Sequence, residues 1–177
     1  KILPIAAIYG GNASGKSNFV KALSFVKKMV VRGTQPDSLI SVDFFRLDDS
    51  TAKQPARFVL ELLIHEKMYE YSFAVTQKAV IEEKLIEIKP SSEKILFHRI
   101  NGKSNLHKSL CKDQVLEIVF RGTRDNQLFI NNSVSQNVET FRPIYNWFKD
   151  VLILITPDSR YEFDEYPDED HPFFSSM

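Results

Sequence analysis

The 177-residue chain lacks the features of a disulfide-stabilised, zinc-binding or membrane-spanning protein. Its one cysteine, Cys111, excludes an intrachain disulfide, and its apolar neighbours favour a buried or half-buried thiol over a nucleophile. Four histidines are scattered without the spacing of metal ligands: His65, His98, His107 and His171. No run of about 18 apolar residues occurs, so no membrane-spanning helix is expected.

The chain also lacks a net charge, because 23 Lys and Arg residues balance 23 Asp and Glu residues. Overall charge therefore gives no argument for binding nucleic acid or an anionic membrane, although folding could still gather a local basic face. We find no signal-peptide pattern and expect a cytoplasmic protein without membrane contact.

The most informative feature present is the stretch Gly10-Gly11-Asn12-Ala13-Ser14-Gly15-Lys16-Ser17. It fits G-x-x-x-x-G-K-[ST], the phosphate-binding loop (P-loop). The glycines at 10 and 15 allow a tight turn that approaches a ligand, and the amides of the loop form a nest for an anion. Lys16 supplies a positive charge for the β- and γ-phosphates of a nucleotide, and Ser17 supplies a hydroxyl ligand for Mg²⁺.

The flanking sequence favours this interpretation. Residues 2–9 form an apolar run typical of a buried parallel strand, and apolar residues at 19, 23, 26 and 30 predict a helix over 17–31. The N-terminus of that helix would then lie at the loop and favour a phosphate. The sequence thus predicts a nucleotide-binding core over residues 1–32.

Residues 33–105 are expected to form an antiparallel β subdomain preceded by a loop. Alternating apolar residues predict strands near 58–64, 69–75, 80–88 and 95–100, joined by short polar turns. No helix separates these strands, so they cannot form the parallel sheet of a small P-loop kinase.

Residues 106–150 are expected to be mostly helical. Residues 106–121 fit either one or two short helices or a helix and a strand, and the pattern over 131–148 predicts helix with a new start near Pro143.

The last region, 151–177, is expected to begin with a buried strand over 151–155 and to end in an acidic tail. Residues 158–170 hold seven acidic residues with three interspersed aromatic residues. They fit an acidic interaction surface, a solvated loop, or the beginning of a further element.

Asn12 and Asn18 give the loop the form G-G-N-A-S-G-K-S-N. This resembles the ABC-type ATPase heads of the SMC and RecF-like group, and still more closely the bacterial AAA-type ATP-binding proteins of the abortive-infection and OLD-nuclease kind. The meander after the P-loop helix is similar to the ABC β subdomain. The stretch 128–137 ahead of Pro143-Ile144-Tyr145-Asn146-Trp147-Phe148, and the strand ending at Thr156-Pro157-Asp158, also resemble that family.

The resemblance implies an α/β ABC-type head lobe that binds ATP and Mg²⁺ through residues 10–18, with Lys16 and Ser17 in their usual roles. It implies that Gln136 is the glutamine that binds Mg²⁺ and the attacking water and senses the γ-phosphate, an assignment for which Gln127 is a rival. An ordinary surface glutamine is the other interpretation of Gln136. The resemblance further implies a second ATPase subunit, a toxin or nuclease effector in antiviral defence, and possible contact with DNA.

Three parts of the family pattern have no counterpart here: an apolar strand ending in Asp-Glu (Walker B), a Ser-Gly signature loop and a switch histidine. We therefore expect the N-terminal lobe of a longer ATPase, with almost no turnover alone. The alternative is a nucleotide sensor or scaffold that does not hydrolyse ATP. A GTPase is disfavoured because no Asn-Lys-x-Asp motif occurs, and a small-molecule kinase because of the meander.

Overall fold

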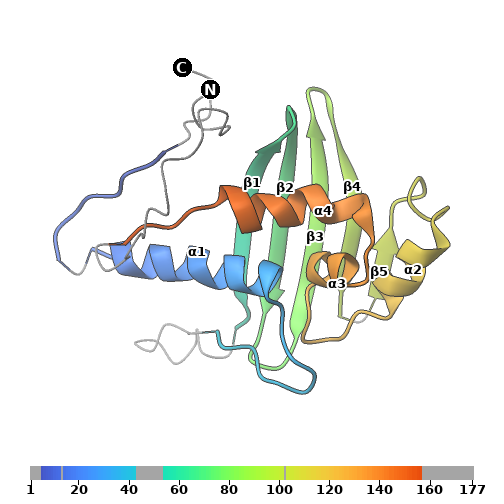
Figure 1. Cartoon of the computed structure of the whole chain (residues 1–177), viewed down its shortest axis with the longest axis horizontal. Helices are drawn as coiled ribbons and strands as arrows, with labels where there is room; N and C mark the ends of the chain where they lie inside the picture. The colour runs from blue at the N-terminus through green and yellow to red at the C-terminus, as the bar shows by residue number, and fades with distance from the viewer. Residues whose placement is uncertain (1–4, 13, 43–53, 102, 157–177) are drawn as a thin grey trace, which may run out of the picture.

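A computed structural model describes residues 5–12, 14–42, 54–101 and 103–156, and shows a five-stranded sheet with helices packed on one face (Figure 1). The strands are β1 (Ala56–Ile64), β2 (Lys67–Val75), β3 (Val80–Lys89), β4 (Ser92–Ile100) and β5 (Lys103–Leu106). The helices are α1 (Lys16–Val31), α2 (Gln114–Arg121), α3 (Phe129–Ser135) and α4 (Arg142–Asn146). A 3₁₀ turn, η2 (Glu139–Phe141), precedes α4, and a π-helical turn, η3 (Trp147–Val151), follows it.

The strands follow one another in chain order, and each neighbouring pair is antiparallel. The predicted meander and the mixed α/β class are therefore confirmed. The β1–β2 hairpin turns at His65 and Glu66, which have φ of 46° and 64°. Two consecutive residues with positive φ are typical of the tight turn that suits the twist of a hairpin.

The core lies between the sheet and the helical layer. Alternate strand residues such as Leu62, Tyr71 and Phe73 face the helices and are almost fully buried. Phe25 of α1 packs on Phe58 of β1, with ring centroids 5.2 Å apart. At the other end of the sheet, edge-to-face ring contacts join β4 to α2, α3 and η2 through Phe97, Phe120, Phe129 and Phe141.

A charged pair is buried inside this core, where sheet meets helix. Glu83 of β3 is 0% exposed, and its carboxylate accepts hydrogen bonds from Tyr71 Oη (3.0 Å) and Arg99 Nη1 (3.0 Å). It also accepts from the backbone amides of Phe129 (2.7 Å) and Ile130 (3.3 Å) at the start of α3. The carboxylate thus attaches α3 to the middle of the sheet.

Two expected strands do not form in the described residues. Residues 5–9, the described part of the run 2–9, are exposed and make no strand; Ile5 is 76% and Tyr9 is 89% exposed. Val151 belongs to η3, and 152–156 also make no strand, with Ile155 70% exposed. A parallel strand needs a hydrogen-bonded neighbour, and the part of the chain that the structure describes provides none at these segments.

The predictions for the helical region after the meander agree with the structure in most respects. The ambiguous stretch 106–121 contains α2, and a short strand that the sequence did not predict, β5, precedes it. The helical prediction for 131–148 is confirmed, with Pro143 at the beginning of α4. Residues 1–4, Ala13, 43–53, Gly102 and 157–177 lie outside the described residues, so the acidic segment 158–170 is among the expectations not described.

We predict that Glu83→Ala lowers the free energy of unfolding by about 3–5 kcal/mol, because it leaves the guanidinium of Arg99 buried without its partner. Urea denaturation followed by circular dichroism measures the change. Glu61→Ala, at an exposed glutamate of β1, is the matched control and should shift stability by less than about 0.5 kcal/mol. Equal effects of the two substitutions would contradict the role given to Glu83.

A second prediction concerns Tyr71. Burial, and then the adjacent Glu83 carboxylate, raise the pKa of the Tyr71 phenol well above its ordinary value of 10.0. The neutral phenol therefore contributes stability that is fully present below about pH 10 and is lost as the pH rises through the folded-state pKa. Tyr71→Phe should make the decline in unfolding free energy above pH 10 shallower in urea titrations. Tyr9→Phe, at an exposed tyrosine, should leave the decline unchanged.

Candidate functional site

The P-loop sequence lies directly at the start of α1. Gly15 is the N-cap and has φ of 90°, a left-handed conformation that an L side chain rarely adopts. The helix then begins at Lys16, and the amide of Phe19 donates to the carbonyl of Gly15 (3.0 Å). The amide of Ser14 donates back to the carbonyl of Gly11 (3.3 Å), so the loop is curled rather than extended.

The side chain of Lys16 turns back over this loop. Its Nζ donates to the carbonyls of Gly10 and Gly11, both at 2.6 Å, and to Ser14 Oγ at 3.2 Å. All three donors of the ammonium are therefore directed at the loop. The ammonium of Lys16 is thereby held beside the loop.

The loop is also open to a ligand. Gly15 has no side chain to cap the first amides of α1, and no acidic residue occupies the first helical turn. These amides and the helix dipole therefore favour an anion at this end of α1. Ser17 is exposed beside them, so its hydroxyl is accessible to a metal ion. These residues fit a nucleotide phosphate with a bound divalent cation.

Gly10 meets a further steric requirement. A Cβ built on Gly10 would lie 2.8 Å from Ser14 Oγ, which is closer than such contacts normally come. A side chain at position 10 would displace Ser14 and disturb one of the contacts of Lys16. Gly11, by contrast, has nothing within 4 Å of a built Cβ.

The structure brings together most of the predicted site. The described residues of 10–18 are exposed, apart from the partly buried Lys16, while Ala13 lies outside the described residues. Gln136 does not lie at the loop. It caps the C-terminal end of α3 with an exposed side chain, and α3 packs near the opposite end of α1 from the loop (Figure 1).

The separation follows from how α3 is attached to α1. The side-chain amide of Asn131 in α3 donates through Nδ2 to the carbonyls of Val30 (2.9 Å) and Val31 (3.3 Å), the last residues of α1. The loop is at the other end of this 16-residue helix, which is about 24 Å long. The rival glutamine, Gln127, is buried, and its side-chain Nε2 donates to Asn131 Oδ1 (2.9 Å).

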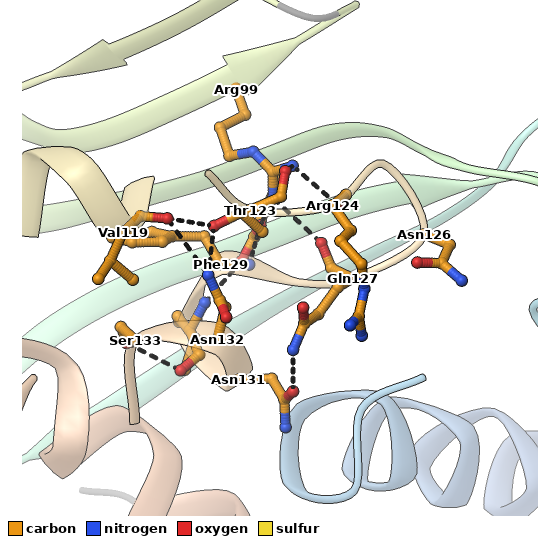
Figure 2. Close-up of polar contacts among 12 residues, drawn as sticks. Arg99, Val119, Thr123, Arg124, Asn126, Gln127, Phe129, Asn131, Asn132 and Ser133 are labelled. Atoms are coloured by element: carbon orange, nitrogen blue, oxygen red, sulfur yellow. Dashed lines mark hydrogen bonds and ion pairs between the residues drawn. The ribbon is translucent and has the colours of Figure 1, made fainter. Parts of the chain in front are cut away.

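The polar cluster around α3 was not predicted from the sequence (Figure 2). Arg99 of β4 donates to the carbonyls of Thr123, Arg124 and Gln127, and so fixes the turn that leads into α3. One signal for it was available: Glu83 shares the buried face of β3 with Leu85, directly across from Arg99. A charge at such a position usually has a buried partner.

A curled glycine-rich loop, seated on a helix start with its lysine folded over it, is the phosphate-binding arrangement of P-loop nucleotide-binding proteins. The model of the family described as "AAA domain, putative AbiEii toxin, Type IV TA system" matches residues 5–175, nearly the whole chain. The chain belongs to this family and is a P-loop ATPase-like domain. No curated protein and no solved structure matches it.

Family membership thus supports nucleotide binding in general but names no substrate or partner for this chain. Within the described ranges, no helix has both the length and the apolarity needed to cross a bilayer.

We predict that Gly15→Ala lowers the free energy of unfolding by about 1–2 kcal/mol, because alanine is strained at the φ of 90° found there. Urea denaturation tests this. Gly11→Ala is the matched control, since the added methyl group meets open space, and it should leave stability unchanged or raise it slightly. A Gly15→Ala variant as stable as the Gly11→Ala variant would contradict the loop geometry.

Proposed function

We propose that residues 10–18 bind the triphosphate of ATP together with Mg²⁺, and that the domain belongs to an ATPase. The observation that supports this most strongly is the position of Lys16 Nζ, within hydrogen-bond distance of two loop carbonyls at the open end of α1. These contacts keep the ammonium of Lys16 beside the loop, close to the amides that would hold a phosphate.

In this proposal each residue has a distinct task. The loop amides and the first turn of α1 hold phosphate oxygens, and Lys16 exchanges its carbonyl contacts for the β- and γ-phosphates. Ser17 supplies a hydroxyl ligand to Mg²⁺, which neutralises phosphate charge when bound. Asn12 and Asn18 flank the phosphates with polar side chains.

The role of Gln136 in sensing the γ-phosphate remains a proposal, and it would require a rearrangement of α3. To sense a γ-phosphate, the end of α3 would have to move along α1 towards the loop. The hydrogen bonds of Asn131 to the last carbonyls of α1 oppose that movement. The geometry of the described residues therefore gives no support to a catalytic Gln136.

Hydrolysis needs groups that polarise water, and the sequence contains no Walker B motif, signature loop or switch histidine. We propose that a further segment and a second ATPase subunit supply them, so that ATP closes a two-headed assembly and hydrolysis opens it. Exposed apolar residues at the loop and at the start of α1, Ile8 and Phe19, support such packing.

The partner context rests on the family description, which names a toxin and a TA system. We propose a toxin or nuclease effector in antiviral defence as the component that the ATPase controls, with DNA as a possible further ligand. Both are inferences from family resemblance.

A second candidate function is a nucleotide sensor that orders a partner without hydrolysing ATP. It is favoured by one observation: the apolar run 151–155 is followed by Thr156-Pro157 and not by Asp-Glu. Phosphate release by the longest natural chain discriminates the two functions, because the sensor binds ATP but releases no phosphate.

We predict that Lys16→Ala weakens ATP binding by at least about tenfold, since a charge-assisted contact to phosphate contributes roughly 1.5–3 kcal/mol. Titration with a fluorescent ATP analogue in the presence of Mg²⁺ measures the affinity. Lys67→Ala, at an exposed lysine at the start of β2, is the matched control and should bind as the wild type does. Unchanged binding and phosphate release in the Lys16→Ala variant would refute the assignment.

A further inference from the structure

α1 has charge of one sign only. It contains four lysines and no acidic residue, and Arg32 follows its last residue, although the chain as a whole has no net charge. Lys21, Lys28 and Arg32 are exposed and recur at helical spacing, so they lie on one side of α1. We call these three residues the basic face.

A groove of about 660 Å³ lies along this face. Lys28 and Val31 of α1 and the following Arg32 line it on one side, and Ile153 and Leu154 on the other. The groove thus combines positive charge with apolar side chains, a mixture that suits an acidic segment with interspersed aromatic residues.

The chain passes along this groove before it leaves the described residues. Lys27 Nζ donates to the carbonyl of Leu152 (2.7 Å), which holds the segment 152–154 against α1. The acidic segment 158–170 begins only four residues after Leu154. Its seven acidic residues and Arg160 leave six negative charges, and Tyr161, Phe163 and Tyr166 are interspersed among them.

We propose that the segment 158–170 docks along the basic face of α1 within the same chain. The carboxylates would pair with Lys21, Lys28 and Arg32, and the aromatic rings would cover the apolar wall of the groove. Exposed ion pairs are individually weak, so the docking depends on their number and on the short tether. A tether of a few residues gives an effective concentration on the order of millimolar.

The same charges argue against a nucleic acid as the occupant. Any polyanion approaching the basic face would meet seven carboxylates tethered beside it, and like charges repel. A second copy of the chain would present the same acidic segment, but at the far lower concentration of free protein.

Zero-length carbodiimide cross-linking of the full chain tests the proposal, because it joins only lysines and carboxylates that are in contact. Mass spectrometry should find 158–170 linked to Lys21 or Lys28 in several-fold excess over links to Lys67 and Lys78, which are exposed elsewhere. The excess should disappear between about 0.05 M and about 0.5 M salt, as the screening length shortens.

Arg32→Glu provides a variant that removes no cross-linkable lysine. It should lower the yield at Lys28 by roughly threefold or more, because it places a like charge in the groove. Arg121→Glu, at an exposed arginine of α2, is the matched control and should leave the yield unchanged. Circular dichroism verifies that both variants are folded.

Mixing ¹⁵N-labelled and unlabelled chains distinguishes links within a chain from links between chains. Links only between chains would overturn the proposal in favour of a second copy. Binding of a DNA duplex that is lost in the Arg32→Glu variant would overturn it in favour of nucleic acid. An equal yield at all exposed lysines would also overturn it.

Discussion

The arrangement of sheet and helices depends on one buried carboxylate. Glu83 is 0% exposed, yet it accepts hydrogen bonds from a phenol, a guanidinium and two backbone amides. The two amides are the first backbone amides of α3, and no side chain at the N-cap of α3 accepts a hydrogen bond from them. Glu83 of β3 therefore takes the place of an N-cap side chain for α3. The lengths of these hydrogen bonds fix the distance between the sheet and the start of α3.

This choice is costly, because taking two charges out of water requires that every donor and acceptor find a partner. The requirement is met here: Nη1 and Nη2 of Arg99 also donate to three carbonyls of the turn before α3, and no buried side-chain polar atom in the described residues lacks a partner. An apolar pair in the same place would tolerate sliding of α3 on the sheet. We infer that the ion pair contributes a unique position for α3 more than it contributes net stability.

The sequence predicted those features that depend on neighbouring residues in the chain. Alternation along 56–100 predicted the meander, because one face of each strand is buried, and the glycine positions predicted the curled loop at Gly15. The strands predicted at 5–9 and 151–155 do not form, and both predictions failed for one reason. An apolar run indicates burial, but it does not provide the neighbouring strand that burial in a sheet requires. The contacts of Asn131 were beyond prediction, because they join residues about a hundred positions apart.

Through these contacts, the helix that begins at the P-loop is connected to the sheet. α1 has the P-loop at its N-terminus, while its last carbonyls are held by Asn131, whose helix is held in turn by Glu83. The two ends of α1 therefore differ. Its C-terminal end is tied to α3 by the side chain of Asn131, while the loop at its N-terminal end is exposed and turns at the left-handed Gly15. If a phosphate binds at the loop, the loop and the flexible Lys16 side chain can adjust to it while the rest of α1 keeps its place on the sheet.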